Sequence, residues 1–337
     1  MKRIALVLIL ALGIVSFASA QVDFGAFKTD LATFATAVSG TLASTASSAG
    51  LSWSQAYIGQ FPHFGVGVSV GASLIPYAAF SPILTLVGAT IPAGLQFIQQ
   101  YGIPLPAAAI DARIGGFGIP FDIGLKFGYL PPELKNLLGS VNVDYLLAGA
   151  DFRLALLKDQ GLSPALSIGV GYTYFQGSVG LPGVLTGPTS VDITALMNAV
   201  GYTGPHSLNF TSPDLNFNWQ SNVIEAKVQL SKQLLLFTPS IGMSAAYGIS
   251  TAGGGLASTM TYLGSATLAQ MQQVFVASGY PAPTSQGFTI ASAANGWAFR
   301  AYGGLNIALL FLNLDVNATY NILSGSFGGS VGLRIQF

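Results

Sequence analysis

The chain has 337 residues, of which 51% are hydrophobic and only 7% charged, with 12 basic and 12 acidic side chains. Ordinary soluble domains carry about 25% charged residues, and a chain without net positive charge offers nucleic acid no basic surface. The absence of cysteine excludes disulfide frameworks, thiolate metal sites and a lipid anchor on cysteine.

The first twenty residues have the three parts of a secretory signal. Lys2 and Arg3 are basic, residues 4–15 are apolar, and Ala18-Ser19-Ala20 is a small-residue cleavage site. The apolar stretch is shorter than the roughly 20 residues that a spanning helix needs. We therefore predict a cleaved signal over residues 1–20, and without it ten basic and twelve acidic side chains remain.

Residues 21–60 form the second predicted segment. Between Phe24 and Ser48 the large apolar side chains recur at spacings of three and four, which is typical of one amphipathic helix. They are Phe27, Leu31, Phe34, Val38 and Leu42. Because this helix precedes the first strand, we expect it to start in the periplasm. It is either a plug that enters the lumen or a periplasmic leader.

Residues 61–337 are predicted to form a transmembrane antiparallel β-barrel. No run of 18 apolar residues follows the signal, and a closed barrel is the other structure that pairs every backbone group in hydrocarbon. Segments that alternate between apolar and polar residues predict about ten strands, within a range of eight to fourteen. They lie near 63–75, 108–117, 121–129, 141–157, 163–176, 215–230, 234–249, 297–310, 312–322 and 327–337.

Two of these segments change parity, around Ala148–Ala150 and around Gln220–Val223. We interpret each change as a β-bulge or as an extension beyond the membrane. The alternative to the whole assignment is a secreted soluble β protein, whose polar strand faces would rarely be so free of Lys and Glu.

The connections and charges support this assignment. If Phe337 ends at the periplasm, the turns on that side are short, and long loops over roughly 76–106, 131–140, 178–213 and 250–290 lie outside. The strand charges fall on polar-face positions, so we expect ion pairs inside the lumen. They are Asp111, Arg113, Asp122, Lys126, Asp151, Arg153, Glu225, Lys227, Arg300, Asp315 and Arg334.

Three long loops each contain a short apolar stretch that ends at Gly and then Pro, which is the usual end of a helix. We expect these helices either to form an apolar collecting surface above the lumen or simply to pack on one another. Their candidate ligand-binding residues are Leu95, Phe97 and Ile98; Leu196, Met197 and Val200; and Met271, Val274 and Phe275.

Three stretches carry a family resemblance: residues 53–67 (WSQAYIGQFPHFGVG), residues 171–175 (GYTYF) and residues 245–248 (AAYG). From about residue 22 to its end the chain resembles the FadL-like long-chain fatty-acid transporters of the outer membrane. The resemblance implies an N-terminal hatch in the lumen, a low-affinity hydrophobic site among helical loops, and lateral escape of the ligand. The chain departs from these transporters in its strand number, which is about ten where the best-known members have fourteen, and no individual ligand-binding residue matches.

The sequence contains no catalytic pattern. His63 and His206 have no partner spacing for a metal or a triad, so we expect both histidines to be solvated or interfacial. We also expect no cofactor and no enzyme activity; the enzymatic alternative is an outer-membrane protease or lipase.

The leading hypothesis is an outer-membrane channel for passive uptake of hydrophobic or amphipathic molecules such as long-chain fatty acids. In it, Arg113, Arg153 and Arg300 receive a carboxylate head group or serve only as ion-pair partners. The alternatives are a general diffusion porin and a structural or adhesive barrel. The expected partners are outer-membrane lipid, the ligand, and the barrel-assembly machinery acting on Phe337.

Overall fold

The computed structural model describes residues 20–48, 53, 55–61, 63–89, 96–130, 135, 141–183, 185 and 187–337. The predicted signal lies almost wholly outside these residues, as does Leu95. Within the described part of the chain, no helix is both long and apolar enough to cross a membrane.

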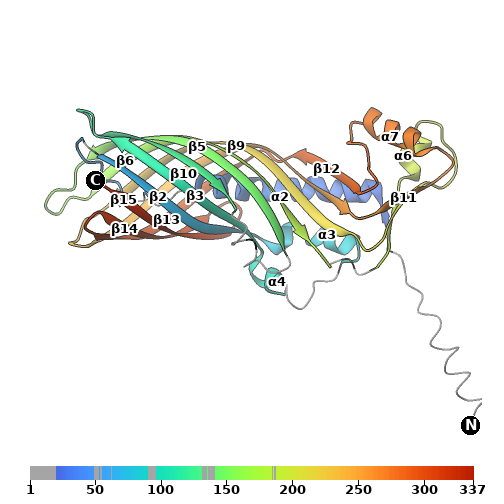
Figure 1. Ribbon diagram of the computed structural model, residues 1–337, viewed down its shortest axis with the longest axis horizontal. Helices are drawn as coiled ribbons and strands as arrows, with labels where there is room; N and C mark the ends of the chain where they lie inside the picture. Colours follow the sequence, from blue (N-terminus) through green and yellow to red (C-terminus); the bar gives the residue numbers. More distant parts are fainter. Residues whose placement is uncertain are drawn as a thin grey trace, which may run out of the picture.

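Ten antiparallel strands close into a barrel, which confirms the predicted fold (Figure 1). Neighbours along the chain pair throughout, and the first and last strands close the wall through the pairing of β15 with β2. The strands are β2 (His63–Ile75), β3 (Ile103–Gly115), β4 (Phe121–Tyr129), β5 (Asn142–Leu157), β6 (Ala165–Leu181), β9 (Asp214–Ser231), β10 (Phe237–Ala257), β13 (Gly296–Leu309), β14 (Leu312–Asn321) and β15 (Ser326–Gln336).

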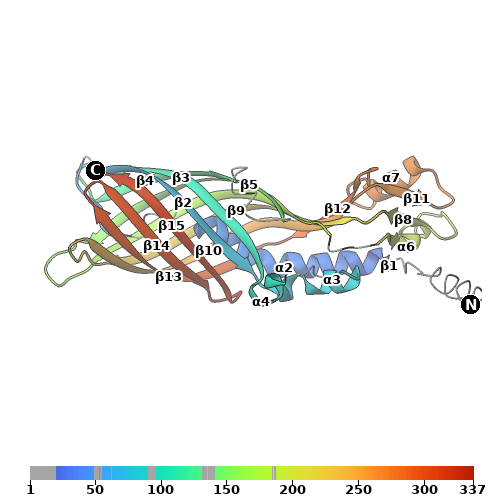
Figure 2. The same ribbon diagram turned by 60° about the horizontal axis from the view of Figure 1, so that its bottom comes forward.

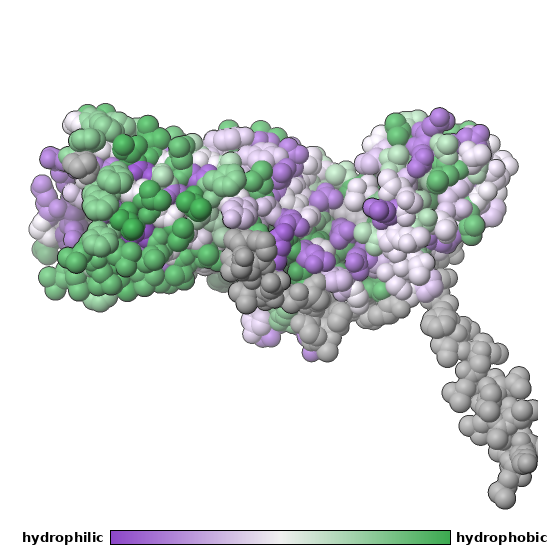
Figure 3. All heavy atoms as spheres, viewed as in Figure 1, coloured by the Kyte–Doolittle hydropathy of each residue, from purple (hydrophilic) through white to green (hydrophobic). Residues whose placement is uncertain are grey.

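The wall has an apolar outer face and a polar inner face, as the alternation predicts. On β15, Leu333 is 43% exposed whereas the neighbouring inward Arg334 is 1% exposed. On the face seen in Figure 3, apolar residues dominate the end of the barrel that carries the C-terminus, and more hydrophilic residues lie toward the loop end. Outward-facing apolar side chains of β2, β4, β6, β9, β14 and β15 are exposed as well, so the belt continues around the wall. At the short-turn end Phe337 stacks on Phe64 at 5.2 Å and accepts and donates backbone hydrogen bonds with it. A closed wall with a lipid-facing belt is an outer-membrane barrel.

The long loops build a head at the other end (Figure 1). It contains a four-stranded sheet in the order β1 (Ala20–Asp23), β7 (Thr189–Asp192), β8 (Ser207–Phe210) and β11 (Met260–Leu263). The helices α6 (Thr194–Asn198) and α7 (Leu268–Ala277) lie beside this sheet, and β12 (Gly287–Ala293) pairs with the far end of β10. Closer to the barrel mouth lie η2 (Tyr77–Ala79), α3 (Ser81–Leu86) and α4 (Phe97–Tyr101).

The helix α2 (Phe24–Ser48) has the predicted bounds and runs along the inside of the wall (Figure 2). All five apolar side chains that predicted it are buried. Its direction differs from the expectation that it starts in the periplasm. β1, immediately before it, is a strand of the head, so α2 begins at the loop end and continues into the barrel toward the short-turn end.

Neither parity change is a β-bulge. The pairings of β9 with β6 and with β10 continue without a register shift, and the one shift in β5 lies at Ala155 and Leu157, away from the predicted place. The same side of β9 faces inward throughout, but its inward residues change from Leu215, Phe217 and Trp219 to Glu225, Lys227 and Gln229. The interior therefore changes chemistry while the strand keeps its geometry.

Candidate functional site

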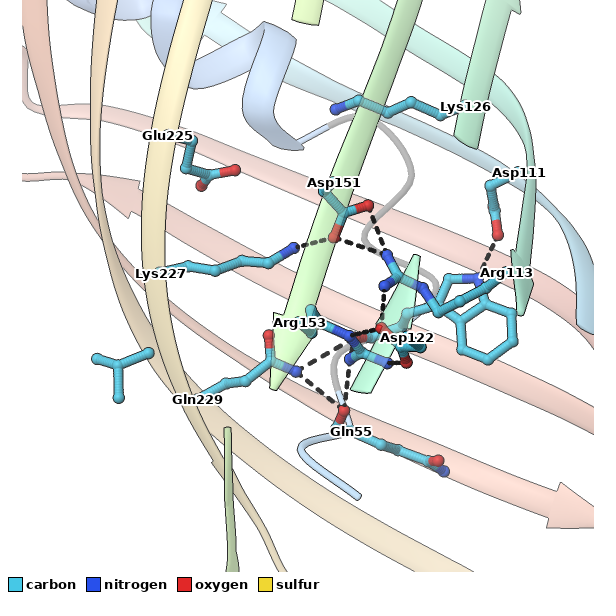
Figure 4. A network of polar contacts seen from close by, with 12 residues as sticks. Gln55, Asp111, Arg113, Asp122, Lys126, Asp151, Arg153, Glu225, Lys227 and Gln229 are labelled. Carbon is cyan, nitrogen blue, oxygen red and sulfur yellow. Dashed lines mark hydrogen bonds and ion pairs between the residues drawn. The ribbon is translucent and has the colours of Figure 1, made fainter. Parts of the chain in front are cut away.

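The lumen near the short turns contains a buried ionic layer (Figure 4). Asp122 of β4 is fully buried and accepts from Arg113 Nη1 at 2.5 Å and from Arg153 Nη2 at 2.5 Å. Asp151 of β5 accepts from Arg113 Nη2 at 2.6 Å and from Lys227 Nζ at 3.0 Å. Successive acceptors and donors come from β3, β4, β5 and β9, so the layer ties four strands together across the lumen.

Two further pairs complete the polar half of the lumen. Arg300 of β13 pairs with Glu225 of β9, and Arg334 of β15 pairs with Asp315 of β14 at 2.7 Å. The expected lumenal ion pairs are therefore present. Arg113, Arg153 and Arg300 all have carboxylate partners already, and ligand binding by any of them stays a prediction.

A short segment after α2 is bound to this layer. Arg153 Nη1 donates to the carbonyl oxygens of Trp53 and Gln55 at 3.0 and 2.8 Å, and Gln229 Nε2 donates to Gln55 O at 2.9 Å. Trp53 Nε1 donates to Asp111, and Ala56 N donates to the Ser231 hydroxyl at 2.8 Å. We call Trp53, Gln55 and Ala56 the latch.

The latch also fills space. The Arg334 guanidinium lies 4.6 Å from the Trp53 ring centroid and the Arg113 guanidinium 5.5 Å from it, which are cation–π distances. Trp53 is 6% exposed. The Trp53 ring therefore packs against Arg113 of the ionic layer and against the neighbouring Arg334.

The lumen toward the loops is apolar. Phe34, Val38 and Leu42 of α2 meet Phe217 of β9 and Ile103 of β3, and the Phe34 and Phe217 ring centroids are 4.7 Å apart. The cavity that these residues line measures about 10 Å³. A cavity of that size holds one water molecule at most. This cavity among α2, β3 and β9 is therefore too small for a ligand in this conformation.

The wall between β3 and β4 is paired along only part of its height. The two strands are in register from Gly115↔Asp122 to Ile110↔Phe127, and β4 ends at Tyr129. Beyond Ile110, residues 103–109 of β3 pair with β2 alone among the described strands. We call residues 103–109 of β3 and the facing residues 128–129 of β4 the seam.

A tyrosine side chain closes the seam in place of a backbone ladder. Tyr145 Oη of β5 accepts from Ala108 N and donates to Ala108 O at 2.8 Å. Backbone groups of alternate strand residues point to the same side, so Pro104 and Pro106 face β4 as Ala108 does. Proline has no N–H to donate. Among the described strands, the β3 edge therefore has no full ladder along residues 103–109.

The three loop helices do not form one surface. α6 and α7 are in contact in the head, whereas α4 lies at the barrel mouth, away from both (Figures 1 and 2). The buried members pack into the apolar core and present no surface to solvent: Ile98, Met197, Met271, Val274 and Phe275. Leu196 is half-buried against that core, and Phe97 and Val200 are exposed by 42% and 51%. Ligand contact by these residues stays a prediction.

Both histidines are buried, so the expectation of solvated or interfacial side chains is wrong. His63 Nε2 lies 3.6 Å from Asp122, and His206 Nδ1 lies 2.5 Å from Tyr262 Oη in the head. Burial raises the pKa of Tyr262. No group of three or more potential metal ligands occurs within the described ranges.

Comparison with known proteins adds little to this geometry. No known protein family matches the chain, and no curated protein matches it either. A solved major outer-membrane protein of Thermus thermophilus is 10% identical, with 81% of this chain and 99% of that chain covered at a TM-score of 0.32. The toluene transporter TbuX of Ralstonia pickettii is 9% identical over 85% of this chain and 93% of its own, at 0.29. The translocator domain of the autotransporter NalP from Neisseria meningitidis is 9% identical over 82% and 88%, also at 0.29. The chain is thus an outer-membrane β-barrel by its own wall and belt, with a latched polar lumen, an apolar upper lumen and a seam between β3 and β4.

Proposed function

We propose that this barrel admits a hydrophobic or amphipathic small molecule at its loop end and releases it sideways through the seam. The observation that carries the proposal is the seam itself, which lies beside the apolar half of the lumen. Inward from it are Leu105 and Leu147, both fully buried, and outward from it are Ala108, Tyr129 and Leu146. These five residues are uncharged, and the nearby Asp144 carboxylate of β5 is already paired with Lys135.

The straight route through the barrel is unfavourable for such a solute. It would have to pass the ionic layer and the latch, where Asp122 is paired with two arginines and the buried Trp53 ring packs against Arg334. Separating a buried ion pair without replacing a partner costs about 3–5 kcal/mol. Opening the seam instead breaks the two hydrogen bonds of one tyrosine, each with a net value of about 1 kcal/mol.

Capture is assigned to α4. Its Phe97 and Tyr101 rings are 42% and 58% exposed, and Ile98 anchors the helix by burial. α4 leads directly into β3, so the two exposed rings stand at the upper end of the seam. This arrangement supports the earlier hypothesis of hydrophobic uptake for α4 alone, since the apolar residues of α6 and α7 are mostly packed in the head.

Crosslinking β3 to β4 across the seam tests the proposal. Extending the β3–β4 register two residues beyond Ile110↔Phe127 brings Ala108 opposite Tyr129, and the chain has no cysteine of its own. Bridging A108C/Y129C with a short bis-maleimide should abolish uptake of a labelled fatty acid or aromatic hydrocarbon into cells. The matched control is A112C/L125C, a register pair in the part of the wall that is already closed, where the same bridge should leave uptake unchanged.

Three results would contradict the proposal. Equal uptake by both bridged barrels would reject the seam as the route. Large, steady conductance in a planar bilayer without ligand binding would favour a general porin. If neither uptake nor conductance is found but cell adhesion depends on the head, the barrel serves as an adhesive support.

A further inference from the structure

The chain descends steadily from the head to the short-turn end before its first barrel strand begins. At the top, the Phe24 ring packs on Phe275 and Tyr280 of the head at 5.3 and 5.4 Å. Deeper, Lys126 Nζ donates to Ala46 O at 2.8 Å. The latch follows in the ionic layer, and Phe61 N finally donates to Gly116 O in a short turn at 2.9 Å.

The residues before α2 are part of the head and not a loose end. β1 pairs in parallel with β7, and Val22 is fully buried. Asp23 Oδ1 accepts from Ala26 N at 2.7 Å, which satisfies a free N–H of the first helical turn. Phe27 packs on Phe288 of β12 at 5.5 Å. The N-terminal segment therefore completes the core of the head.

The lower half of α2 suits a narrow lumen. Every residue from 38 to 47 is buried, and apart from Val38 and Leu42 each is Gly, Ala, Ser or Thr. A Cβ on Gly40 would lie 2.9 Å from Trp297 O of the wall, so the helix and the wall are in close contact there. The helix is about 37 Å long, at about 1.5 Å per residue, which exceeds the roughly 30 Å thickness of the hydrocarbon core.

We infer that the barrel carries its own N-terminal segment across the outer membrane and displays the mature N-terminus at the cell surface. Long loops of such barrels lie outside the cell and short turns lie in the periplasm. β1 lies with the loops, although an N-terminal export signal delivers a chain to the periplasm. The segment therefore crosses together with the barrel, in a hairpin whose descending arm is α2 and whose ascending arm is β2. An epitope peptide joined ahead of Gln21 is then displayed on intact cells.

Single cysteines test this inference, because the chain has none. Thr29 is exposed on the upper part of α2, Ser278 is exposed at the end of α7, and Ser163 is exposed in the turn between β5 and β6. A membrane-impermeant maleimide added to intact cells should label T29C as strongly as S278C and should leave S163C unlabelled. After permeabilisation all three should react.

Labelling of S278C alone in intact cells would overturn the inference, because it would place the upper part of α2 in the periplasm. Labelling of S163C alone would overturn it by reversing the barrel. T33C, exposed on the same helix, repeats the measurement if T29C does not fold, as judged by a heat-modifiable shift in gel migration. The readout does not depend on uptake, so it stands apart from the outcome of the seam experiment.

Discussion

The two halves of the lumen are built largely from the same strands and differ first in the side chains that those strands point inward. On β5, Val143, Tyr145 and Leu147 face the apolar half, whereas Asp151 and Arg153 face the ionic layer. The apolar half is filled by a helix, and the polar half is filled by paired charges and the latch. The difference indicates that the polar half keeps the barrel shut, while the apolar half holds the seam, where the β3–β4 ladder of the described residues ends.

The largest effect is expected from breaking the polar half. D122N removes the carboxylate that Arg113 and Arg153 share, and leaves Arg153 without its charged partner in a fully buried place. We expect a loss of about 3–5 kcal/mol in the free energy of unfolding. Urea unfolding in lipid vesicles, followed by tryptophan fluorescence, measures it.

The control for D122N is D144N. Asp144 pairs with Lys135, but its side chain is 69% exposed, so its contribution should not exceed about 1 kcal/mol. If the two variants lose the same stability, the ionic layer does not hold the polar half. If D122N also conducts more ions, the loss of the Asp122–Arg153 pair has loosened the latch, which Arg153 holds through its hydrogen bonds.

The next effect concerns the fit of α2 in the wall. G40V places a side chain where Trp297 O is already too close, so helix or wall has to shift. Overpacking of this kind costs about 1–3 kcal/mol. We expect lower thermal stability and brief openings in single-channel recordings. A37V, on an exposed position of the same helix, should behave as the native chain does.

These two halves also show how far the sequence alone leads. Alternation predicts the strands because lipid demands an apolar outer face at every second residue, and it therefore places Arg113 and Arg334 inside. The same rule misreads β9, because Leu215 and Phe217 face inward against α2 and only look like a change of parity. The rule assumes a wet lumen, and half of this lumen is dry.

Other features are hidden for different physical reasons. The direction of α2 depends on β1 pairing with β7, a contact across more than 160 residues that no local pattern encodes. The loop helices share one apolar pattern, yet two are packed in the head and one lies at the mouth. The seam is visible in the sequence, because Pro104 and Pro106 on one edge of a strand predict a place where backbone pairing is incomplete.

The apolar half can be tested through its tyrosine. Y145F keeps the ring and removes both hydrogen bonds to Ala108, so we expect a loss of about 2 kcal/mol and faster hydrogen exchange at the Ala108 amide. Uptake should rise, because the seam opens more often. Y302F is the control, since the Tyr302 hydroxyl lies in the polar half and its nearest acceptors are 3.4 Å away. A rise in uptake by both variants would mean that the seam has no special role.

The smallest effect belongs to a pair outside both halves, in the periplasmic turns. Burial alone would raise the pKa of Asp159, but the Gln233 amide and Lys232 outweigh it and hold that pKa below its ordinary value of 3.8. Because the folded-state pKa is lowered, the ionised Asp159 carboxylate stabilises the fold at pH values above its ordinary pKa. This contribution disappears as the pH falls through the folded-state pKa.

The pair joins two turns at the rim, so D159N should cost less than about 1 kcal/mol at neutral pH and nothing in strong acid. Urea unfolding of D159N and of the native chain at neutral and strongly acidic pH measures both terms. A cost at neutral pH as large as that of D122N would show that stability resides in the rim and not in the ionic layer, and the contrast between the two halves of the lumen would lose its basis.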